Sequence, residues 1–545
     1  MITGAELRDA FISAANNITN YREAVDSLNI FPVPDGDTGT NMSNTMNSAL
    51  PCLADMTDDI AVSEVAARVS SALLRGARGN SGAITSLIFR GFAEGLRGCE
   101  EANGVVIASA LRMASENAYK NITSPTEGTI LTVIRLAAEA AEEKSGPEID
   151  TVDVFAAAVE GAHKALKRTP ELLNILKRAK VVDAGGQGLV HIFDAMQNVF
   201  LNHKIVELSA ENIKTTAAEN VVDENDLKFT YCTELLINTE ENRLFDTIDL
   251  RSFLDARGDC VIVVSDDGVI KVHVHSNCPG EIITEALKYG ELANVKIENM
   301  RLQHKNASWG AGTYNAEKKI EIAEPIKKYG FVAVGTGAGI DAVFAELGVD
   351  NTVSGGQTMN PSTEDILNAI NATPAEIVFV FPNNKNIILT ARQAAELTTK
   401  NVVVIESRSI PQCVAAILAF DEQRSESRNT VNMNAAILRV QTVSVTFAAR
   451  DAVVSGQTIC EGDLMGLENG KVTETGDDPN AVAMACIKHI IKRNTEMVTI
   501  YYGEGMTEDA AYKLAEEITR KSGTNLEVSV VFGGQPVYYY IIGIE

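Results

Sequence analysis

The stretch Leu28-Asn29-Ile30-Phe31-Pro32-Val33-Pro34-Asp35-Gly36-Asp37-Thr38-Gly39-Thr40-Asn41 packs two carboxylates, two glycines and several hydroxyl and amide side chains into one turn. The two prolines exclude a helix before the turn, whereas the residues after Asn41 are compatible with one. Asp35 and Asp37 are therefore expected on a rigid loop directly before a helix. Carboxylate oxygens suit a hard cation, and the N–H groups of a helix start suit phosphate, so the pattern predicts a magnesium and phosphate site.

An Asp-Gly-Asp string also has a plainer interpretation, in which Asp37 or Thr38 caps a helix after a tight turn. The stretch taken alone favours neither interpretation. A calcium-binding EF-hand loop fits less well, because Gly39 and Met46 would occupy its fifth and twelfth positions, where it needs ligands.

Composition predicts a multidomain protein of the cytoplasm. A chain of 545 residues is long enough for about three or four domains, and we find no apolar run of ~18 residues and no signal peptide. The eight cysteines form no CxxC pair, which fits a reducing compartment. A net charge of −26 argues against nucleic acid as a partner, although local N–H groups and metal ions can still bind a nucleotide.

The first domain, residues 1–204, has helical periodicity throughout, so it is predicted to be all-α. Three further glycine-bearing loops precede helical stretches: Gly79-Asn80-Ser81-Gly82, Gly128-Thr129 and Asp183-Ala184-Gly185-Gly186. Each loop alone is explained by capping. Arg78 is a candidate for contact with the phosphates, but a solvated loop position is the favoured interpretation. Independent caps would not need the same glycine-rich pattern at nearly every loop, so the four together favour one nucleotide pocket.

A polar segment from Glu207 to Asp226 is predicted to contain a linker, and a small α+β domain follows over residues 226–303. His273 and His275 would point to one face of a strand, and Cys232 lies on another strand of the same domain. These three residues are candidate zinc ligands, although their spacing matches no common zinc finger. Two surface histidines and a buried cysteine are the alternative interpretation.

The last domain, residues 319–545, follows a second predicted linker, His304 to Lys318. Its short apolar runs alternate with helical patterns, which indicates a parallel sheet with crossover helices. Gly335-Thr336-Gly337-Ala338-Gly339 lacks the full dinucleotide-binding spacing and is best explained as a tight strand-to-helix turn. The loop Gly355-Gly356-Gln357-Thr358-Met359-Asn360-Pro361-Ser362 is either a surface for a ligand or partner or an irregular crossover.

The four N-terminal loops together resemble the nucleotide-binding L domain of dihydroxyacetone kinases. Val272-His273-Val274-His275-Ser276-Asn277-Cys278-Pro279-Gly280, Ile297-Glu298-Asn299-Met300 and the Gly355 to Ser362 loop extend the resemblance to the ATP-binding subunit of bacterial fatty acid kinase. This resemblance implies an eight-helix barrel that holds Mg-ATP, a middle dimerisation domain, and a C-terminal domain similar to DegV-type fatty-acid-binding proteins. It therefore implies a homodimer.

The resemblance also implies roles for single residues. Asp35 and Asp37 would hold two magnesium ions, and Asn29 stands nearest to where the L-domain pattern has a third aspartate. Cys232, His273 and His275 match the residues implicated in zinc binding. The nucleotide would be lined by Thr38, Gly39, Thr40, Asn41, Asn80, Ser81, Gly82, Thr129, Asp183, Ala184 and Gly185.

The implied activity is transfer of the γ-phosphoryl group of ATP to the carboxylate of a fatty acid, which a separate DegV-type protein presents. Dihydroxyacetone kinases carry their substrate on a histidine of a K domain, and nothing in this chain resembles that domain. Two alternatives stay open: a dihydroxyacetone or related small-molecule kinase with another partner, and a nucleotide-sensing scaffold without turnover.

Overall fold

The computed structural model describes residues 1–545 except 30–35, 123–124, 210–230, 239–249, 252, 255, 267–268, 300–321, 357–359, 455–456, 493–494 and 523–525. The chain forms two compact units. The first unit is Met1–Ser209 together with Lys319–Glu545, and the second is Ala210–Lys318. Both predicted linkers, Glu207 to Asp226 and His304 to Lys318, fall largely or wholly outside the described residues.

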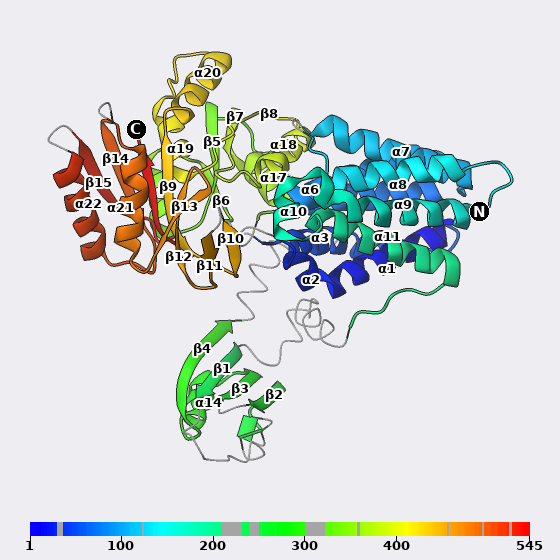
Figure 1. Ribbon diagram of the computed structural model, residues 1–545, viewed down its shortest axis with the longest axis horizontal. Coiled ribbons are helices and arrows are strands. Elements are labelled where there is room, and N and C mark those ends of the chain that lie inside the picture. Colours follow the sequence, from blue (N-terminus) through cyan, green and yellow to red (C-terminus); the bar gives the residue numbers. More distant parts are fainter. Residues whose placement is uncertain are drawn as a thin grey trace. The chain divides into compact units, whose positions relative to one another are not determined.

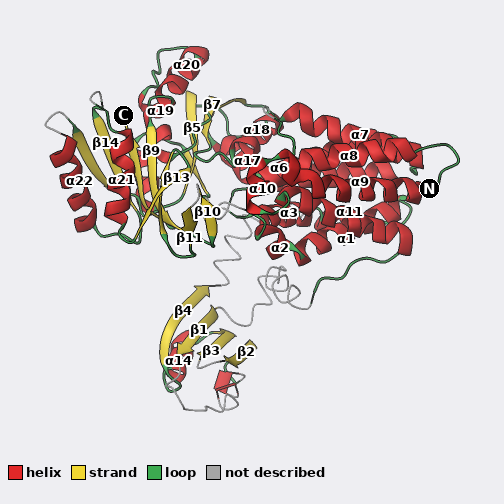
Figure 2. Ribbon diagram, in the orientation of Figure 1, coloured by secondary structure: helices red, strands yellow, loops and turns green. Residues whose placement is uncertain are grey.

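The N-terminal domain is all-α, as predicted (Figures 1 and 2). Its described part contains eight helices of ten or more residues: α1 (Gly4–Asn20), α3 (Thr38–Asn47), α5 (Val62–Gly76), α6 (Gly79–Gly95), α7 (Gly104–Asn121), α8 (Ile130–Lys144), α9 (Thr151–Leu172) and α11 (Ala184–Asn202). Three shorter helices lie between them: α2 (Arg22–Asp26), α4 (Leu50–Ala54) and α10 (Asn174–Ala179).

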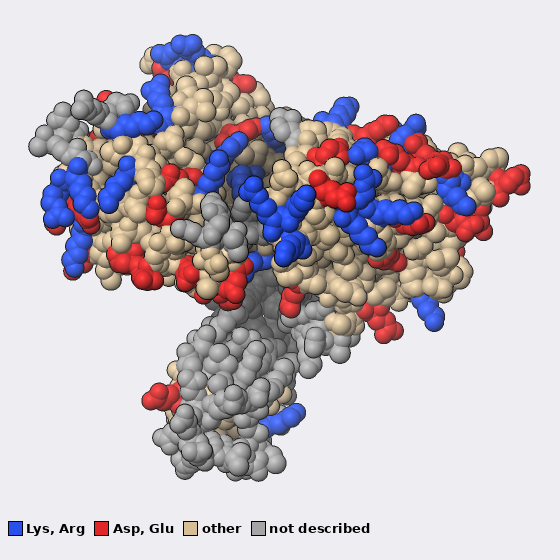
Figure 3. Space-filling model, viewed as in Figure 1, with Lys and Arg blue, Asp and Glu red and all other residues tan. Residues whose placement is uncertain are grey.

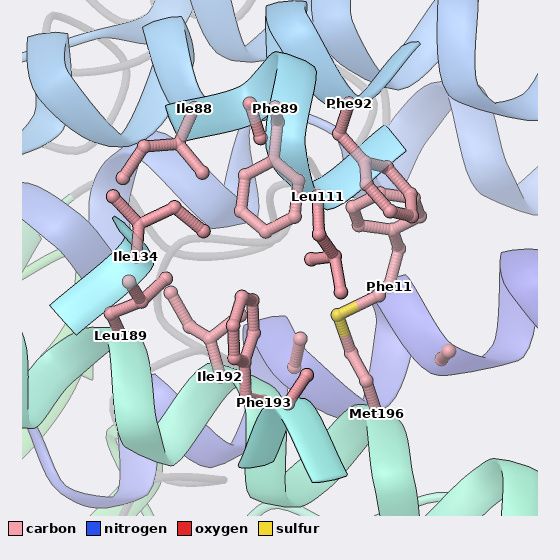
Figure 4. Packing of buried hydrophobic residues seen from close by; sticks show 14 of the residues in the cluster. Phe11, Ile88, Phe89, Phe92, Leu111, Ile134, Leu189, Ile192, Phe193 and Met196 are labelled. Atoms are coloured by element: carbon pink, nitrogen blue, oxygen red, sulfur yellow. The ribbon is translucent and has the colours of Figure 1, made fainter. Parts of the chain in front are cut away.

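The long helices close into a ring around one apolar core. Contacts run in sequence order from α5 through α6, α7 and α8 to α9, then from α9 to α11, and α1 joins α11 back to α5. Figure 4 shows Phe11, Phe89 and Phe193 pointing into this core from three different helices. The ring brings the starts of several helices together at one end, which is the property that a shared pocket requires.

The described part of the C-terminal domain contains two large sheets and one small two-stranded sheet (Figure 2). The first has the order β6-β5-β7-β8 and is wholly parallel. Its strands are β5 (Lys327–Gly335), β6 (Asn351–Ser354), β7 (Ala375–Phe381) and β8 (Asn401–Val404). The helices along this part of the chain are α16 (Ala338–Glu346), α17 (Thr363–Ala372), α18 (Ile388–Leu397), α19 (Ile410–Leu418) and α20 (Glu426–Ile437). The predicted parallel sheet with crossover helices is confirmed.

The second sheet is mixed, in the order β13-β12-β9-β16-β14-β15. Its strands are β9 (Gln441–Phe447), β12 (Leu464–Glu468), β13 (Lys471–Gly476), β14 (Met497–Tyr502), β15 (Glu527–Phe532) and β16 (Tyr538–Ile544). Helices α21 (Pro479–Ile490) and α22 (Glu508–Ser522) and the small pair β10 (Ala452–Val454) and β11 (Gln457–Ile459) complete this half.

The second unit is a small α+β fold, as predicted. Its antiparallel sheet has the order β2-β3-β1-β4. The elements are β1 (Tyr231–Asn238), β2 (Gly258–Asp266), β3 (Val269–Ser276), α14 (Pro279–Ala286) and β4 (Glu291–Asn299). In the part of the chain that the structure describes, no helix is both long and apolar enough to cross a bilayer.

The loop after β5 is the predicted strand-to-helix turn. Gly337 has a φ of +128°, a conformation that only glycine adopts readily. The N–H groups of Gly339 and Ile340 at the start of α16 donate to the carbonyl oxygen of Gly533. Since these donors are already bonded to the protein, they are not free for a dinucleotide, and the turn has a structural role.

Replacing Phe193 with alanine should destabilise the helical domain, because the side chain is 1% exposed in the centre of the ring. We expect a loss of about 3–5 kcal/mol in the free energy of unfolding, measured by urea denaturation followed by circular dichroism. Leu201→Ala on the same helix is the control, since Leu201 is 51% exposed. Equal losses in the two variants would contradict the assignment of the core.

Candidate nucleotide-binding site

Asp26, a residue that the sequence did not single out, holds the start of α3. One of its carboxylate oxygens accepts hydrogen bonds from the backbone N–H groups of Gly39 and Thr40, at 2.6 and 3.2 Å, and the other accepts from the hydroxyl of Thr40, at 2.7 Å. Burial raises the pKa of Asp26, whereas its bonds to Thr40 and Gly39 act in the opposite direction. Asp26, the last residue of α2, therefore caps the start of α3 from 13 residues away in the sequence.

Asp37 occupies the N-cap position of α3, but its side chain makes no capping hydrogen bond. The interpretation of Asp37 as a simple cap is therefore wrong. Its carboxylate lines a cavity and accepts a hydrogen bond of 2.6 Å from the side-chain amide of Asn360. Beside it, the hydroxyl of Thr38 donates to the amide oxygen of Asn29 at 2.9 Å.

The cavity has a volume of about 390 Å³ and collects residues from all four predicted loops. This size is typical of a pocket for a small molecule. Of the predicted site residues it is lined by Asn29, Asp37, Thr38, Asn41, Asn80, Ser81, Thr129, Asp183 and Gly185. Further lining residues that sequence reasoning missed are Ile84, Ile122, Thr126, Ile130, Leu131, Lys385 and Asn386.

Four predicted residues are not among those that line the cavity: Gly39, Thr40, Gly82 and Ala184. Two of them have packing reasons to be small. A Cβ atom on Gly39 would lie 2.2 Å from the carbonyl oxygen of Arg22, and one on Gly82 would lie 2.3 Å from the hydroxyl of Thr45. Asp35 lies outside the described residues.

Three of the four helix starts in the predicted loops are capped by side chains. Asp26 serves α3, Thr129 accepts from the N–H of Leu131 at the start of α8, and Asp183 accepts from the N–H of Gly186 at the start of α11. The start of α6 has no side-chain cap, and Gly79 has a φ of +55° there. The N–H groups of this turn, beside Asn80 and Ser81, are the most suitable donors for a phosphate.

Asp183 is a second carboxyl group in the cavity. Burial raises its pKa to about 6, although the backbone groups of Gly186 and Ile130 favour the ionised form. Its protonation state therefore changes close to neutral pH.

The C-terminal domain contributes to the same site. Lys385 and Asn386 line the cavity, and the amide of Asn80 donates to the side-chain oxygen of Asn386 at 3.3 Å. The guanidinium group of Arg450 donates to the carbonyl oxygens of Asp26 and Asn29, both at 2.8 Å. The loop before α3 is thus held from both domains of the first unit.

The sequence suggested that Arg78 is a solvated loop arginine, and the structure shows that this interpretation is wrong. Its guanidinium group donates to the carbonyl oxygen of Asn360 at 3.0 Å and lies 3.9 Å from the carboxylate of Asp365. It joins the two domains.

The predicted zinc ligands lie on neighbouring strands, where Cys232 of β1 pairs with His275 of β3 and Glu234 with His273. The side chains of Cys232, His273 and His275 lie outside the described residues. Among the side chains that the structure describes, no cluster of three or more His, Cys, Asp or Glu residues is arranged to hold a metal.

Three family models match the chain. Residues 32–198 match the DAK2 domain, residues 228–307 the middle domain of the FakA-like fatty acid kinase proteins, and residues 330–545 the C-terminal domain of the same proteins. "Protein YloV" of Bacillus subtilis is 38% identical over 100% of this chain and 99% of its own length. The chain belongs to the FakA-like fatty acid kinase family. It is therefore a fatty acid kinase subunit with a kinase-type phosphotransferase domain, and such a domain implies that it binds a nucleotide.

Other relatives extend over the whole chain as well. An uncharacterised protein of Staphylococcus haemolyticus is 36% identical over 100% of this chain and 99% of its own length. Among solved structures, a fatty-acid-binding DegV family protein from Thermus thermophilus aligns with a TM-score of 0.29 and 14% identity, covering 40% of this chain and 99% of its own. A DegV family protein from Corynebacterium glutamicum aligns with a TM-score of 0.33 and 14% identity, covering 40% and 97%.

The raised pKa of Asp183 predicts a pH-dependent effect on stability. The folded state favours the protonated carboxyl, so its contribution to stability is present below the unfolded pKa of 3.8 and is lost as the pH rises through about 6. Asp183→Asn should therefore stabilise the helical domain above pH 6, on the order of 2 kcal/mol, and by much less at pH 4. Thermal unfolding at several pH values measures this difference, and a gain that does not change with pH would contradict it.

Proposed function

We propose that this chain transfers the γ-phosphoryl group of ATP to the carboxylate of a fatty acid and produces an acyl phosphate. The proposal rests on the cavity, which lies in a chain that belongs to the FakA-like fatty acid kinase family. It joins the carboxylate of Asp37 to the uncapped start of α6 beside Asn80 and Ser81. A carboxylate for a hard cation next to N–H groups for phosphate is the combination that Mg-ATP requires.

The residues present fit magnesium. Asp37 and the amide oxygen of Asn29 are hard oxygen donors that line the cavity, and Asp35 is two residues away in the sequence. In our proposal Asp35 and Asp37 hold two magnesium ions, whose positive charge would offset the negative charge of the phosphates. Asn29 is the weaker candidate as a third ligand, because its oxygen already accepts from Thr38.

The chemistry of the acceptor explains why the cavity needs no general base. A fatty acid carboxylate is already ionised at neutral pH, so the protein has only to position it and to balance the charge of the phosphoryl group. No histidine or cysteine is found among the described residues that line the cavity. Polar amides and hydroxyls supply positioning instead.

A basic surface lies beside the cavity. Lys and Arg side chains gather over α10 and the adjoining end of α9 (Figure 3). The exposed members of this surface are Lys167, Arg168, Lys177, Arg178 and Lys180. A Cβ atom on Gly128, the neighbour of the lining residue Thr129, would contact Leu172 and Leu173 at the end of α9. The basic surface gives an acidic protein a local field that attracts an anionic nucleotide or acceptor.

The acceptor in our proposal arrives on a separate DegV-type fatty-acid-binding protein, because the cavity of about 390 Å³ is the one that the nucleotide occupies in our proposal. Further parts of the proposal are a homodimer formed through the middle domain and a zinc ion held by Cys232, His273 and His275. The pairing of Cys232 with His275 supports the zinc site, since it brings the two residues to adjacent strands.

Asp37→Ala and Asp35→Ala should each abolish ATP-dependent formation of acyl phosphate, because each removes a proposed magnesium ligand. Both variants should keep the thermal midpoint of the wild-type protein within a few degrees. Acyl phosphate is measured by mass spectrometry after trapping with hydroxylamine. Retained turnover in either variant would overturn the metal assignment.

The identity of the acceptor is tested by supplying candidates to the full chain with Mg-ATP. Release of ADP together with acyl phosphate only when a fatty-acid-loaded DegV-type protein is present would support the proposal. Release of ADP with free dihydroxyacetone would favour a small-molecule kinase instead. Nucleotide binding without turnover in every mixture would favour a nucleotide-sensing scaffold.

A further inference from the structure

A segment of the C-terminal domain, residues 360–363, is bonded directly to the loop between α5 and α6. Ser362 forms an antiparallel β-bridge with Arg78, and the N–H of Thr363 donates to the carbonyl oxygen of Ala77 at 3.0 Å. Ser362 and Asp365 also form a capping box at the start of α17. The segment is therefore held by hydrogen bonds to both the C-terminal domain and the helical domain.

This segment carries Asn360, which is 1% exposed and lies against the loop before α3. Its amide nitrogen donates to the carboxylate of Asp37 at 2.6 Å. A carboxylate can only accept, so this contact requires the nitrogen of the amide to face Asp37. The contact spans 323 residues of sequence.

The amide oxygen of Asn360 is buried and has no hydrogen-bond partner among the described residues. An unpaired buried acceptor is unfavourable, and such groups persist where a ligand or an ordered water supplies the missing donor. An ordered water molecule is a donor of the required kind. Asn360 thus has its amide nitrogen committed to Asp37 and its buried amide oxygen without a partner among the described residues.

Arg450 anchors the same loop from a second point of the C-terminal domain. It bonds the carbonyl oxygens of Asp26 and Asn29, and its Nη2 atom lies 1.9 Å from where a Cβ on Gly36 would be. The glycine between the two aspartates therefore leaves room for the guanidinium group of Arg450.

We propose that the C-terminal domain completes the kinase site of its own chain, with Asn360 as a positioning residue for the Asp37 carboxylate. This inference rests on the proposed function, in which Asp37 holds magnesium. A hydrogen bond to a ligating carboxylate fixes its orientation, and loss of such a bond commonly weakens metal binding about 10- to 100-fold. The C-terminal domain then acts in cis on magnesium and nucleotide binding.

The test compares Asn360→Ala with Gln393→Ala in the full-length protein. Gln393 is a matched control, because its amide also bonds the helical domain, at the carbonyl oxygen of Ala83 and the hydroxyl of Ser86, but these two residues do not line the nucleotide cavity, whereas Asp37 does. Binding of a fluorescent ATP analogue is measured as a function of free Mg²⁺. Thermal midpoints without Mg²⁺ report any general loosening of the interface.

Asn360→Ala should raise the half-saturating Mg²⁺ concentration about 10- to 100-fold. Gln393→Ala should leave the half-saturating Mg²⁺ concentration within about twofold of the wild-type value. It should lower the thermal midpoint at least as much as Asn360→Ala does. Asn360→Leu, which keeps the volume of the side chain but removes the donor, should behave like Asn360→Ala. Equal Mg²⁺ requirements in the Asn360 and Gln393 variants would overturn the inference.

Asp37→Ala in the same assay separates this inference from the proposed function. If Asp37→Ala raises the Mg²⁺ requirement and the Asn360 variants do not, the role of Asn360 is wrong and the metal assignment stands. If Asp37→Ala leaves the Mg²⁺ requirement unchanged, the metal assignment fails together with the inference that rests on it.

Discussion

The arrangement of this site depends on one carboxylate, Asp26, at the start of α3. By accepting from the N–H groups of Gly39 and Thr40, Asp26 satisfies donors that a helix otherwise leaves open. The neighbouring Asp37 is then not needed as a cap, and its carboxylate faces the cavity. Because Asp26 takes over the capping of α3, the carboxylate of Asp37 is left for the cation of our proposal.

The fold supplies the rest of the site by geometry. A closed ring of helices brings the starts of α3, α6, α8 and α11 to one pocket, and the side chains that cap three of them leave α6 as the open donor. The C-terminal domain adds Lys385 and Asn386 to the wall of this pocket. The pocket is therefore a property of the first unit as a whole, with contributions from both of its domains.

The sequence predicted the local parts of this site and missed the distant ones. Each loop has a glycine or a capping residue directly before a helical stretch, so Asn80, Thr129 and Asp183 were recognisable from neighbours in the sequence. Asp26 acts 13 residues from its helix start, and Asn360 lies 323 residues from Asp37. Such contacts form only when the tertiary structure is complete, and no local pattern encodes them. The same reason explains why Arg78 was misassigned.

The central claim is that the carboxylate oxygen of a fatty acid attacks the phosphoryl group of ATP at this chain. The most direct measurement follows that oxygen, with a fatty acid labelled with ¹⁸O at both carboxylate oxygens and presented by the DegV-type protein. Hydroxylamine then attacks the acyl carbon and releases the phosphate. Our account predicts that each released phosphate carries one ¹⁸O atom from the fatty acid. Unlabelled phosphate formed along with ADP would contradict it.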